Sequence, residues 1–464
     1  MTRSETRRGL LLAVGLVACR SEAKVGATPP PDAALRVSTS DAAAGASGRV
    51  LAARCHTTER AVRLDDGPGL DDLDIGDGLA HAGGYAVGIV HRAAAGRVAA
   101  VALVNAAAAE ARIVDLAPTL GDAPPPRLVS CRDQLVAAAF ALPHAPTADG
   151  GGSSMARDLA LYVVDSQGPE QPVIHIPQKS DESLAFDLAC SGASGLAVWD
   201  ETAAGGGEGG AAAARGMAAR GVIRGASFQV GQRAAGPSDL SPPDSDAEMP
   251  RTVPSGAGFF VFWLARRADV TKASDGSADI EAIGEARAFG WLEMVVVDRA
   301  GQKVGPVRRL TPTSGHVSAY DALAHFDGPK PEVWVVARDD GESIDAAGGT
   351  LLRVRLQSEG GEPPVVLPTD GLGRGAPAFV DAPLPWLSWV GPHEEVRLMP
   401  LDTAGDAVAP PSAEEGLDEA RPLVGLASGR DVPGPARGPS NQGPLLVAVP
   451  RDKVAQLRVF DCQR

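Results

Sequence analysis

The chain has 464 residues, of which 44 % are hydrophobic and only 4 % aromatic, so its core must be filled mainly by Val, Leu and Ala. The formal net charge of −15 repels nucleic-acid phosphates and anionic lipid headgroups, which excludes binding to either through a broad basic face. The 55 glycines and 38 prolines lie between short apolar runs, a distribution typical of many short elements joined by turns.

The N-terminus has the organisation of an export signal. A basic start with three arginines precedes an apolar run at 9–18, which is too short for a membrane-spanning helix of roughly 20 residues. The sequence Leu16-Val17-Ala18-Cys19 resembles the lipobox of bacterial prolipoproteins. This resemblance implies that 1–18 is a signal peptide and that Cys19 carries a lipid. The alternative is an ordinary cleaved secretory signal.

Residues 19–48 predict a flexible tether between the lipid and the folded body. The proline run Pro29–Pro31 and the Ala/Gly-rich segment 42–48 contain almost nothing that could be buried. The folded body should therefore occupy 49–464. We expect it to lie at the bacterial cell envelope, anchored to the outer membrane or the cell surface.

From residue 49 onward the apolar pattern is that of an all-β protein. One compact apolar run recurs at separations of 50 to 73 residues, and its seven copies start at Tyr85, Leu135, Leu196, Phe260, Val333, Trp386 and Leu445. A strand ending in a polar-glycine turn follows several of them, at 162–168, 295–301, 354–360 and 400–406. These turns predict hairpins between the third and fourth strands of a sheet. The pattern predicts a single β-propeller of seven four-stranded blades, and the alternative is a pair of β-sandwich domains.

One unit also resembles known propeller repeats. Residues 332–341, with Gly361-Glu362-Pro363 and Val365-Val366-Leu367, are similar to a repeat of TolB-type propellers. The Asp-x-x-Gly turns resemble those of quinoprotein-type propellers. The resemblance implies a fold class and carries no function across.

Four cysteines remain once Cys19 is assigned to lipid, an even number in a compartment that permits disulfides. Only one strand, 456–461, follows the Leu445 run, so segment 49–64 is expected to complete the last sheet. Cys55 and Cys462 would then meet at the seam of the ring, and a disulfide between them would fasten it. Cys131 and Cys190 fall in the first strands of successive units and form the second predicted pair. Free or differently paired thiols are the alternative.

Three insertions interrupt the repeat, at 144–156, 203–220 and 268–289. Each is predicted to connect the second and third strands of its unit, which would bring all three to one face of the ring. Long connections on a rigid scaffold are common binding sites. The charged insertion 268–289 is the best candidate contact surface, whereas the Gly/Ala composition of 203–220 favours evolutionary drift.

The densest acidic cluster spans 65–78. Its candidate ligands for a calcium ion are Asp71, Asp72, Asp74 and Asp77. The spacing lacks the distal glutamate of an EF-hand, so a solvated acidic turn without any bound metal or other cofactor is the interpretation we favour.

Sequence motifs for zinc hydrolysis, nucleotide binding and serine hydrolysis do not occur. We therefore expect a monomeric, lipid-anchored and non-catalytic binding or scaffold module. Its ligand would be an envelope protein or a glycan, its only membrane contact the lipid on Cys19, and it would bind no nucleic acid. The alternative is an envelope glycan hydrolase or lyase whose acidic residues converge at one mouth of a propeller channel.

Overall fold

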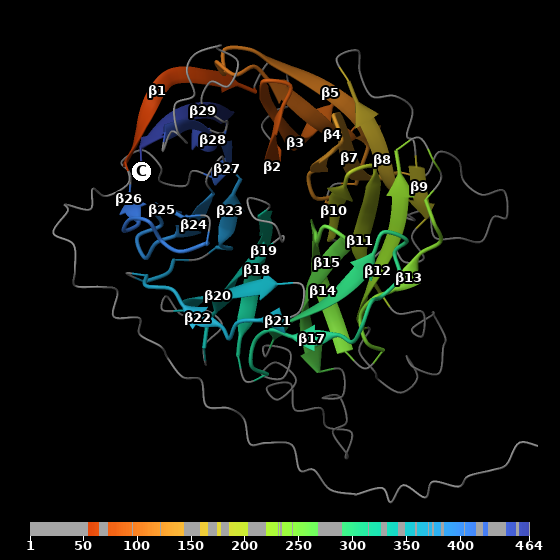
Figure 1. Ribbon diagram of the computed structural model, residues 1–464. Coiled ribbons are helices and arrows are strands. Elements are labelled where there is room, and N and C mark those ends of the chain that lie inside the picture. The colour runs from red at the N-terminus through yellow and green to blue at the C-terminus, as the bar shows by residue number, and fades with distance from the viewer. Residues whose placement is uncertain are drawn as a thin grey trace, which may run out of the picture. The chain divides into compact units, whose positions relative to one another are not determined.

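The computed structural model describes residues between Arg54 and Gln463, with its longest gaps at 65–72, 143–157, 166–173, 178–184, 203–219, 268–289, 342–348, 414–420 and 426–441. All 29 regular elements in the described part are β-strands, and they form seven antiparallel sheets (Figure 1). No described segment is a helix long and apolar enough to cross a membrane. The prediction of an all-β fold is confirmed.

The first three sheets are simple meanders, and we number them as blades in chain order. Blade 1 contains β2 (Asp74–His81), β3 (Gly84–Ala93), β4 (Gly96–Val104) and β5 (Ala111–Pro118). Blade 2 contains β6 (Arg127–Cys131), β7 (Gln134–Ala141), β8 (Asp158–Val164) and β9 (Ile174–Pro177). Blade 3 contains β10 (Phe186–Ser191), β11 (Ser194–Thr202), β12 (Gly221–Gln229) and β13 (Ser238–Asp239).

The next three sheets follow the same order and have short outer strands. Blade 4 contains β14 (Ser245–Pro254), β15 (Gly258–Arg267), β16 (Trp291–Asp298) and β17 (Arg308–Arg309). Blade 5 contains β18 (Val317–His325), β19 (Glu332–Asp339), β20 (Thr350–Gln357) and β21 (Gly360–Gly361), and β22 (Val365–Val366) also pairs with β20. Blade 6 contains β23 (Ala378–Val380), β24 (Trp386–Val390), β25 (Val396–Pro400) and β26 (Ser412–Ala413).

Blade 7 joins the two ends of the body. Its strands are β27 (Arg421–Gly425), β28 (Gln442–Arg451), β29 (Val454–Gln463) and, as the outer member, β1 (Arg54–Arg63). Strand β1 runs antiparallel to β29, and Cys55 lies directly opposite Cys462 in the register. The predicted completion of the last sheet by an N-terminal strand is therefore confirmed.

The ring closes because the innermost strand of every blade contacts that of the next. These contacts run from β2 through β6, β10, β14, β18, β23 and β27 and back to β2. All seven recurring apolar runs of the sequence form the second strands of their blades. Together with the seven sheets, this order defines a seven-bladed β-propeller, so the predicted propeller is confirmed and the alternative of two β-sandwich domains is excluded.

The hydrophobic core lies between neighbouring blades. Second strands supply its largest side chains, and Trp199, Trp263 and Trp334 of blades 3, 4 and 5 are fully buried. Smaller residues fill the remaining space, for example Ala100 and Ala102 between blades 1 and 7. The low aromatic content is thus compensated by alanine and valine on closely packed sheets.

Two hairpins, one in blade 4 and one in blade 6, connect the third and fourth strands through the same type of Asp-x-x-Gly turn. Asp298 accepts two backbone N–H hydrogen bonds within its turn, both of 2.9 Å, and Asp402 accepts an equivalent pair in blade 6. Gly301 and Gly405 take the left-handed position, with φ of 83° and 73°. In blade 5, Gly360 lies in strand β21 opposite Gln357, and the turn residues 358–359 lie outside the described residues, so the left-handed glycine predicted there stays a prediction.

Both turns pack against the blade that precedes them. The Ser227 hydroxyl of β12 donates a 3.0 Å hydrogen bond to the carbonyl of Ala300, in the turn of blade 4. The Arg353 guanidinium of β20 donates likewise to the carbonyl of Gly405, in the turn of blade 6. These turns therefore tie adjacent blades together at the rim of the ring. The turn predicted at 162–168 lies partly outside the described residues.

The three insertions predicted from the sequence fall where they were expected. The gaps at 143–157, 203–219 and 268–289 separate β7 from β8, β11 from β12 and β15 from β16. Each joins a second strand to a third. Because successive strands are antiparallel, the strand ends that flank these gaps lie on one face of the ring, together with the links between blades.

Candidate functional site

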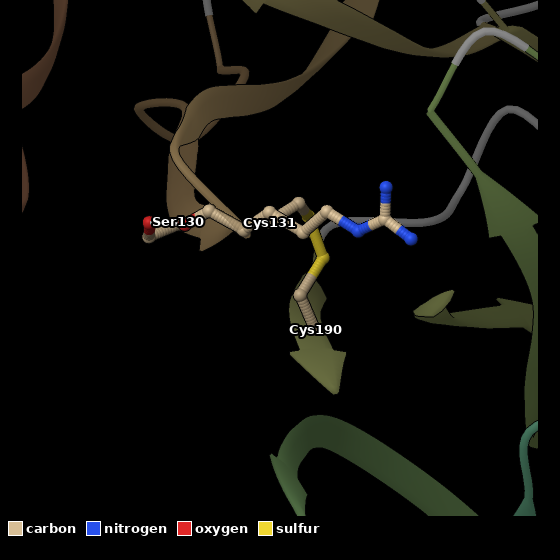
Figure 2. Close-up of a disulfide and its surroundings, with 4 residues drawn as sticks. Ser130, Cys131 and Cys190 are labelled. Atoms are coloured by element: carbon tan, nitrogen blue, oxygen red, sulfur yellow. Dashed lines mark hydrogen bonds between the residues drawn. A yellow bond between two sulfur atoms is a disulfide. The ribbon is translucent and has the colours of Figure 1, made fainter. Parts of the chain in front are cut away.

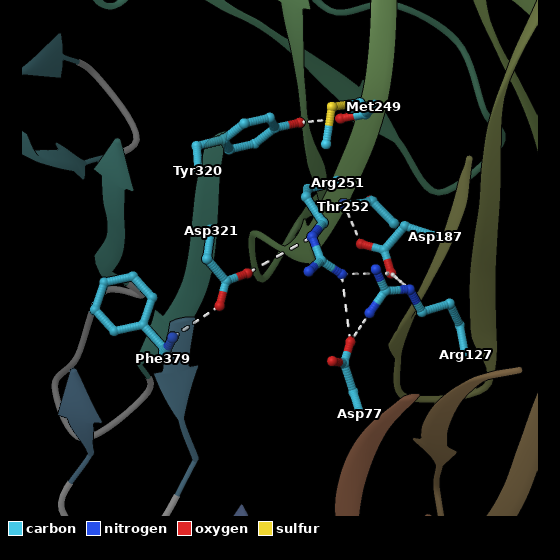
Figure 3. A network of polar contacts seen from close by, with 9 residues as sticks. All are labelled: Asp77, Arg127, Asp187, Met249, Arg251, Thr252, Tyr320, Asp321 and Phe379. Carbon is cyan, nitrogen blue, oxygen red and sulfur yellow. Dashed lines mark hydrogen bonds and ion pairs between the residues drawn. The ribbon is translucent and has the colours of Figure 1, made fainter. Parts of the chain in front are cut away.

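Five consecutive inner strands each place one charged side chain at the same level of the central channel. We call this set the charged girdle, and its members are Asp77 of β2, Arg127 of β6, Asp187 of β10, Arg251 of β14 and Asp321 of β18 (Figure 3). In blades 2 to 5 the girdle residue pairs with a residue near the middle of the second strand. The sign of the charge alternates from blade to blade, which brings each arginine close to aspartates on both sides.

Four members of the girdle form a closed cycle of ion pairs. Arg127 pairs with Asp77, and its Nε lies 3.9 Å from Oδ1 of Asp187. Arg251 completes the cycle, because its Nη1 lies 3.8 Å from Oδ1 of Asp187 and 3.4 Å from Oδ2 of Asp77. Its Nε also lies 3.6 Å from Oδ1 of Asp321. A single guanidinium thus contacts three carboxylates.

One of these contacts reaches across the channel. Arg251 belongs to blade 4 and Asp77 to blade 1, and two blades separate them in the ring. Figure 3 shows the Arg251 guanidinium extending between Asp321 and Asp77. At this level, side chains from blades that are not neighbours in the ring contact each other directly.

The aspartates of blades 3 and 5 also hold the backbone of the following blade. Asp187 Oδ2 accepts a 2.7 Å hydrogen bond from the N–H of Thr252, and Asp321 Oδ2 accepts a 2.8 Å bond from the N–H of Phe379. An inner strand has a sheet partner on one side only, so N–H groups on its other edge need partners of another kind. The two carboxylates supply them, and their side chains are only 12 % and 15 % exposed.

Irregular backbone accompanies the girdle in two blades. The register of β2 shifts between Ile75 and Gly78, where Asp77 lies, and that of β14 shifts just before Arg251. In the second bulge, Met249 adopts a φ of 54°, and its carbonyl accepts a 2.5 Å hydrogen bond from the Tyr320 hydroxyl. A β-bulge turns the side chains next to it. Here both bulges adjoin residues that meet across the channel.

The surroundings of the girdle fix the protonation states of two groups. Burial lowers the pKa of Arg251, but the charges of Asp321 and Asp187 outweigh this effect and raise it above its ordinary value. Burial raises the pKa of Tyr320 well above 10, and Arg251 opposes that shift only partly. Arg251 is therefore a permanent cation and Tyr320 a neutral hydrogen-bond donor at any physiological pH.

The spacing of the carboxylates alone would suit glycosidic bond cleavage. Asp77 and Asp187 both lie within 4 Å of the same Arg251 nitrogen, close enough for the roughly 5–10 Å separation of paired catalytic carboxyls. However, both carboxylates are engaged in ion pairs, Asp187 with Arg127 and Arg251 and Asp77 with the same two arginines. The arrangement links the inner strands of five blades through ion pairs.

The acidic cluster proposed as a calcium site is divided in the structure. Asp74 pairs with Arg97 of β4, two strands away in the same blade, whereas Asp77 points into the girdle. Asp71 and Asp72 lie outside the described residues. Within the part of the chain that is described, no group of three or more His, Cys, Asp or Glu side chains could hold a metal ion. The solvated acidic turn that we favour for this segment, and the calcium site that is its alternative, both stay untested.

One of the two predicted disulfides is present. Cys131 of β6 and Cys190 of β10 are bonded and join the inner strands of blades 2 and 3 (Figure 2). Cys55 and Cys462 are opposite each other in the β1–β29 register, but their side chains are not among those described, so this pairing stays a prediction. Cys19 also lies outside the described residues, and its lipidation is likewise a prediction.

Sequence reasoning found Asp77 but missed the other four girdle residues. Each is one charged residue within a first strand, and no local motif sets it apart. A usable signal was nevertheless present. Aligning the units on their second strands and reading the residues that pair with the middle of each would have shown the alternation of charge.

The chain is a seven-bladed β-propeller closed by its N-terminal strand. It is similar in fold to the β-propeller domain of the Trilobed protease from Pyrococcus furiosus, with 9 % identity and a TM-score of 0.44 over 84 % of this chain and 93 % of that one. It is also similar to the polysaccharide lyase Uly1, with 6 % identity and a TM-score of 0.48 over 83 % and 89 % of the two chains. No protein-family model and no curated protein sequence matches the chain.

A third similar structure is a prolyl endopeptidase, with 15 % identity and a TM-score of 0.43 over 82 % of this chain. This chain spans only 46 % of that protein. At such low identities the likeness to all three structures concerns the fold alone, and it carries no activity or substrate across.

Proposed function

We propose that the protein is a lipid-anchored, non-catalytic binding module of the bacterial envelope. The observation that carries this proposal is the position of its three longest connections between second and third strands. The strand ends that flank 143–157, 203–219 and 268–289 lie on one face of a rigid ring. Loops grouped on a rigid scaffold are where proteins of this kind bind their partners.

The charged girdle supports a non-catalytic role. Arg127 and Arg251 engage Asp77 and Asp187 in ion pairs, which leaves these carboxylates with partners within the protein. The rival function is hydrolysis or elimination on an envelope glycan. The closeness of Asp77 and Asp187 is the observation that favours this rival.

Anchoring is tested by replacing the predicted lipidation site. Cys19→Ser should move the protein from the membrane fraction to the soluble fraction and remove the mass of the lipid. Cys55→Ser is the matched control, because it alters a cysteine of the folded body and should leave the protein in the membrane fraction. Retention of Cys19→Ser in the membrane would contradict lipid anchoring.

Binding is tested by shortening the connections one at a time. Replacing 269–288 by a short Gly/Ser turn should abolish a defined crosslinked species in intact envelopes, whereas the same change at 204–218 should leave it. If neither change alters crosslinking, the grouped connections are not the binding surface. Conversion of purified envelope glycan by the wild-type protein, abolished by Asp187→Asn, would establish the catalytic rival instead.

A further inference from the structure

Asp77 differs from the other aspartates of the charged girdle. Its side chain is 39 % exposed, against 12 % for Asp187 and 15 % for Asp321, and it lies in the β-bulge of β2. A single oxygen, Oδ2, contacts both Arg127 and Arg251. Two guanidinium groups from different blades therefore converge on one solvent-accessible carboxylate.

The two arginines keep their positions through contacts on their other sides. Arg251 is also held by Asp187 and Asp321, and each of these aspartates is fixed by a backbone N–H of the next blade. Arg127 is held between Asp77 and Asp187. The guanidinium pair is therefore partly preorganised without Asp77. Preorganised guanidinium groups are good receptors for carboxylates, because their planar donors match the two oxygens.

We propose that Arg127 and Arg251 form a carboxylate-binding site that Asp77 occupies as an internal ligand, and that the carboxylate of an external ligand can take its place. The exchange leaves the two guanidinium groups paired with a carboxylate in both states, while the complex gains one negative charge from the ligand. The net charge of −15 repels polyanions, so the site favours a ligand with a single carboxylate. This inference rests on the proposed binding function and names the chemical class of its ligand.

An external carboxylate can bind only while Asp77 is away from the site. Its apparent affinity is therefore the intrinsic affinity multiplied by the fraction of molecules in which Asp77 has left. Removing the Asp77 carboxylate should therefore expose the site. The probe is sodium acetate, compared with sodium chloride at the same ionic strength, and acetamide is the uncharged analogue. The readout is the thermal unfolding midpoint of the purified full-length protein, because a ligand that binds only the folded state raises it.

We expect acetate, but neither chloride nor acetamide, to raise the midpoint of Asp77→Ala. Wild type should need about tenfold more acetate for the same shift, because Asp77 competes for the site. Adding Arg127→Gln to Asp77→Ala should abolish the response. Asp74→Ala is the matched control, since it removes an aspartate of the same strand that pairs with Arg97 outside the girdle. It should show no response to acetate beyond that of wild type.

The inference is overturned if Asp77→Ala shows no acetate-specific shift, or if the double variant retains one. Should Asp77→Ala fail to fold, Asp77→Ser provides the same comparison with a smaller change in polarity. If both variants fail to fold, wild type and Arg127→Gln are titrated with acetate and their unfolding midpoints are compared. Equal shifts of the midpoint in the two proteins overturn the inference. Loss of acetate binding with intact crosslinking in envelopes would refute this inference alone and leave the proposed function standing.

Discussion

Arg251 in blade 4 lies 3.4 Å from Asp77 in blade 1, although two blades separate them in the ring. Neighbouring blades of the propeller are already joined by packed apolar faces. This contact instead joins two blades that share no such interface. The charged girdle therefore acts as a brace across the channel as well as along its wall.

Removal of Arg251 should be costly. Arg251→Met would leave Asp187 and Asp321 facing each other without their shared cation, and breaking such a partly buried network typically costs about 3 kcal/mol. Arg266→Met is the control, because Arg266 pairs with Glu248 at the surface of the same blade and should cost about 1 kcal/mol or less. Urea unfolding measures both. If both substitutions lower the free energy of unfolding equally, the girdle contributes no more to stability than a surface ion pair.

The stability of the protein should fall in alkaline solution. Burial raises the pKa of Tyr162 to about 12 and that of Tyr320 well above 10. The unfolded chain ionises tyrosine near pH 10, so this stabilisation is complete below pH 10 and is lost as the pH rises through the folded-state value. Between pH 8 and pH 11, Tyr162 should lower the free energy of unfolding by about 1 kcal/mol, and Tyr320 should change it in the same direction.

The measurement is the unfolding free energy at these two pH values for wild type, Tyr162→Phe and Tyr320→Phe. Each substitution should make stability less dependent on pH. Tyr320→Phe should also lose about 1 kcal/mol at pH 8, because the hydrogen bond to the Met249 carbonyl disappears. An unchanged pH dependence in both variants would contradict the assignment to these tyrosines.

The disulfide between blades 2 and 3 should be a major stabilising element. It joins residues 59 apart in the sequence, and the chain-entropy model gives about 4 kcal/mol for a loop of that length. The double change Cys131→Ser and Cys190→Ser should lower the unfolding free energy by this order. Reductant should lower the stability of wild type and have a smaller effect on the variant.

The seam should contain a second disulfide. Cys55 and Cys462 are directly opposite on adjacent antiparallel strands, and Cβ atoms at such positions are typically about 5 Å apart. Peptide mapping of the oxidised protein without reduction should yield a crosslinked peptide that contains both residues. Alkylation of either thiol before reduction would show that the seam is held by strand pairing alone.

The turn of blade 6 should not tolerate a side chain. Gly405 has a φ of 73°, and an added Cβ would lie 2.8 Å from the buried indole of Trp334 in blade 5. Gly405→Ala should cost about 2–4 kcal/mol, from left-handed strain and overpacking together. Gly305→Ala is the matched control, since Gly305 also has a positive φ of 91° but no atom within 4 Å of an added Cβ. It should cost about 1 kcal/mol, and equal losses in urea unfolding would exclude a contribution from packing.

The architecture was predictable because it repeats. The apolar runs from Tyr85 to Leu445 mark seven second strands, and the lone final strand indicated that another segment must complete the last blade. The girdle was not predictable from local patterns. Arg127 and Arg251 are 124 positions apart, and they approach the same carboxylate only because strand register brings successive blades to a common level.

The pairing of β1 with β29 also affects how the protein reaches its native state. Strand β1 precedes every other described strand and β29 follows them all, so the ring can close only after synthesis of nearly the whole body. Contacts between such distant segments form slowly. Until β1 docks, β29 presents an unpaired edge that can pair with another chain. Aggregation during folding is therefore a hazard at the last blade, and a chaperone that shields this edge would raise the yield of monomer.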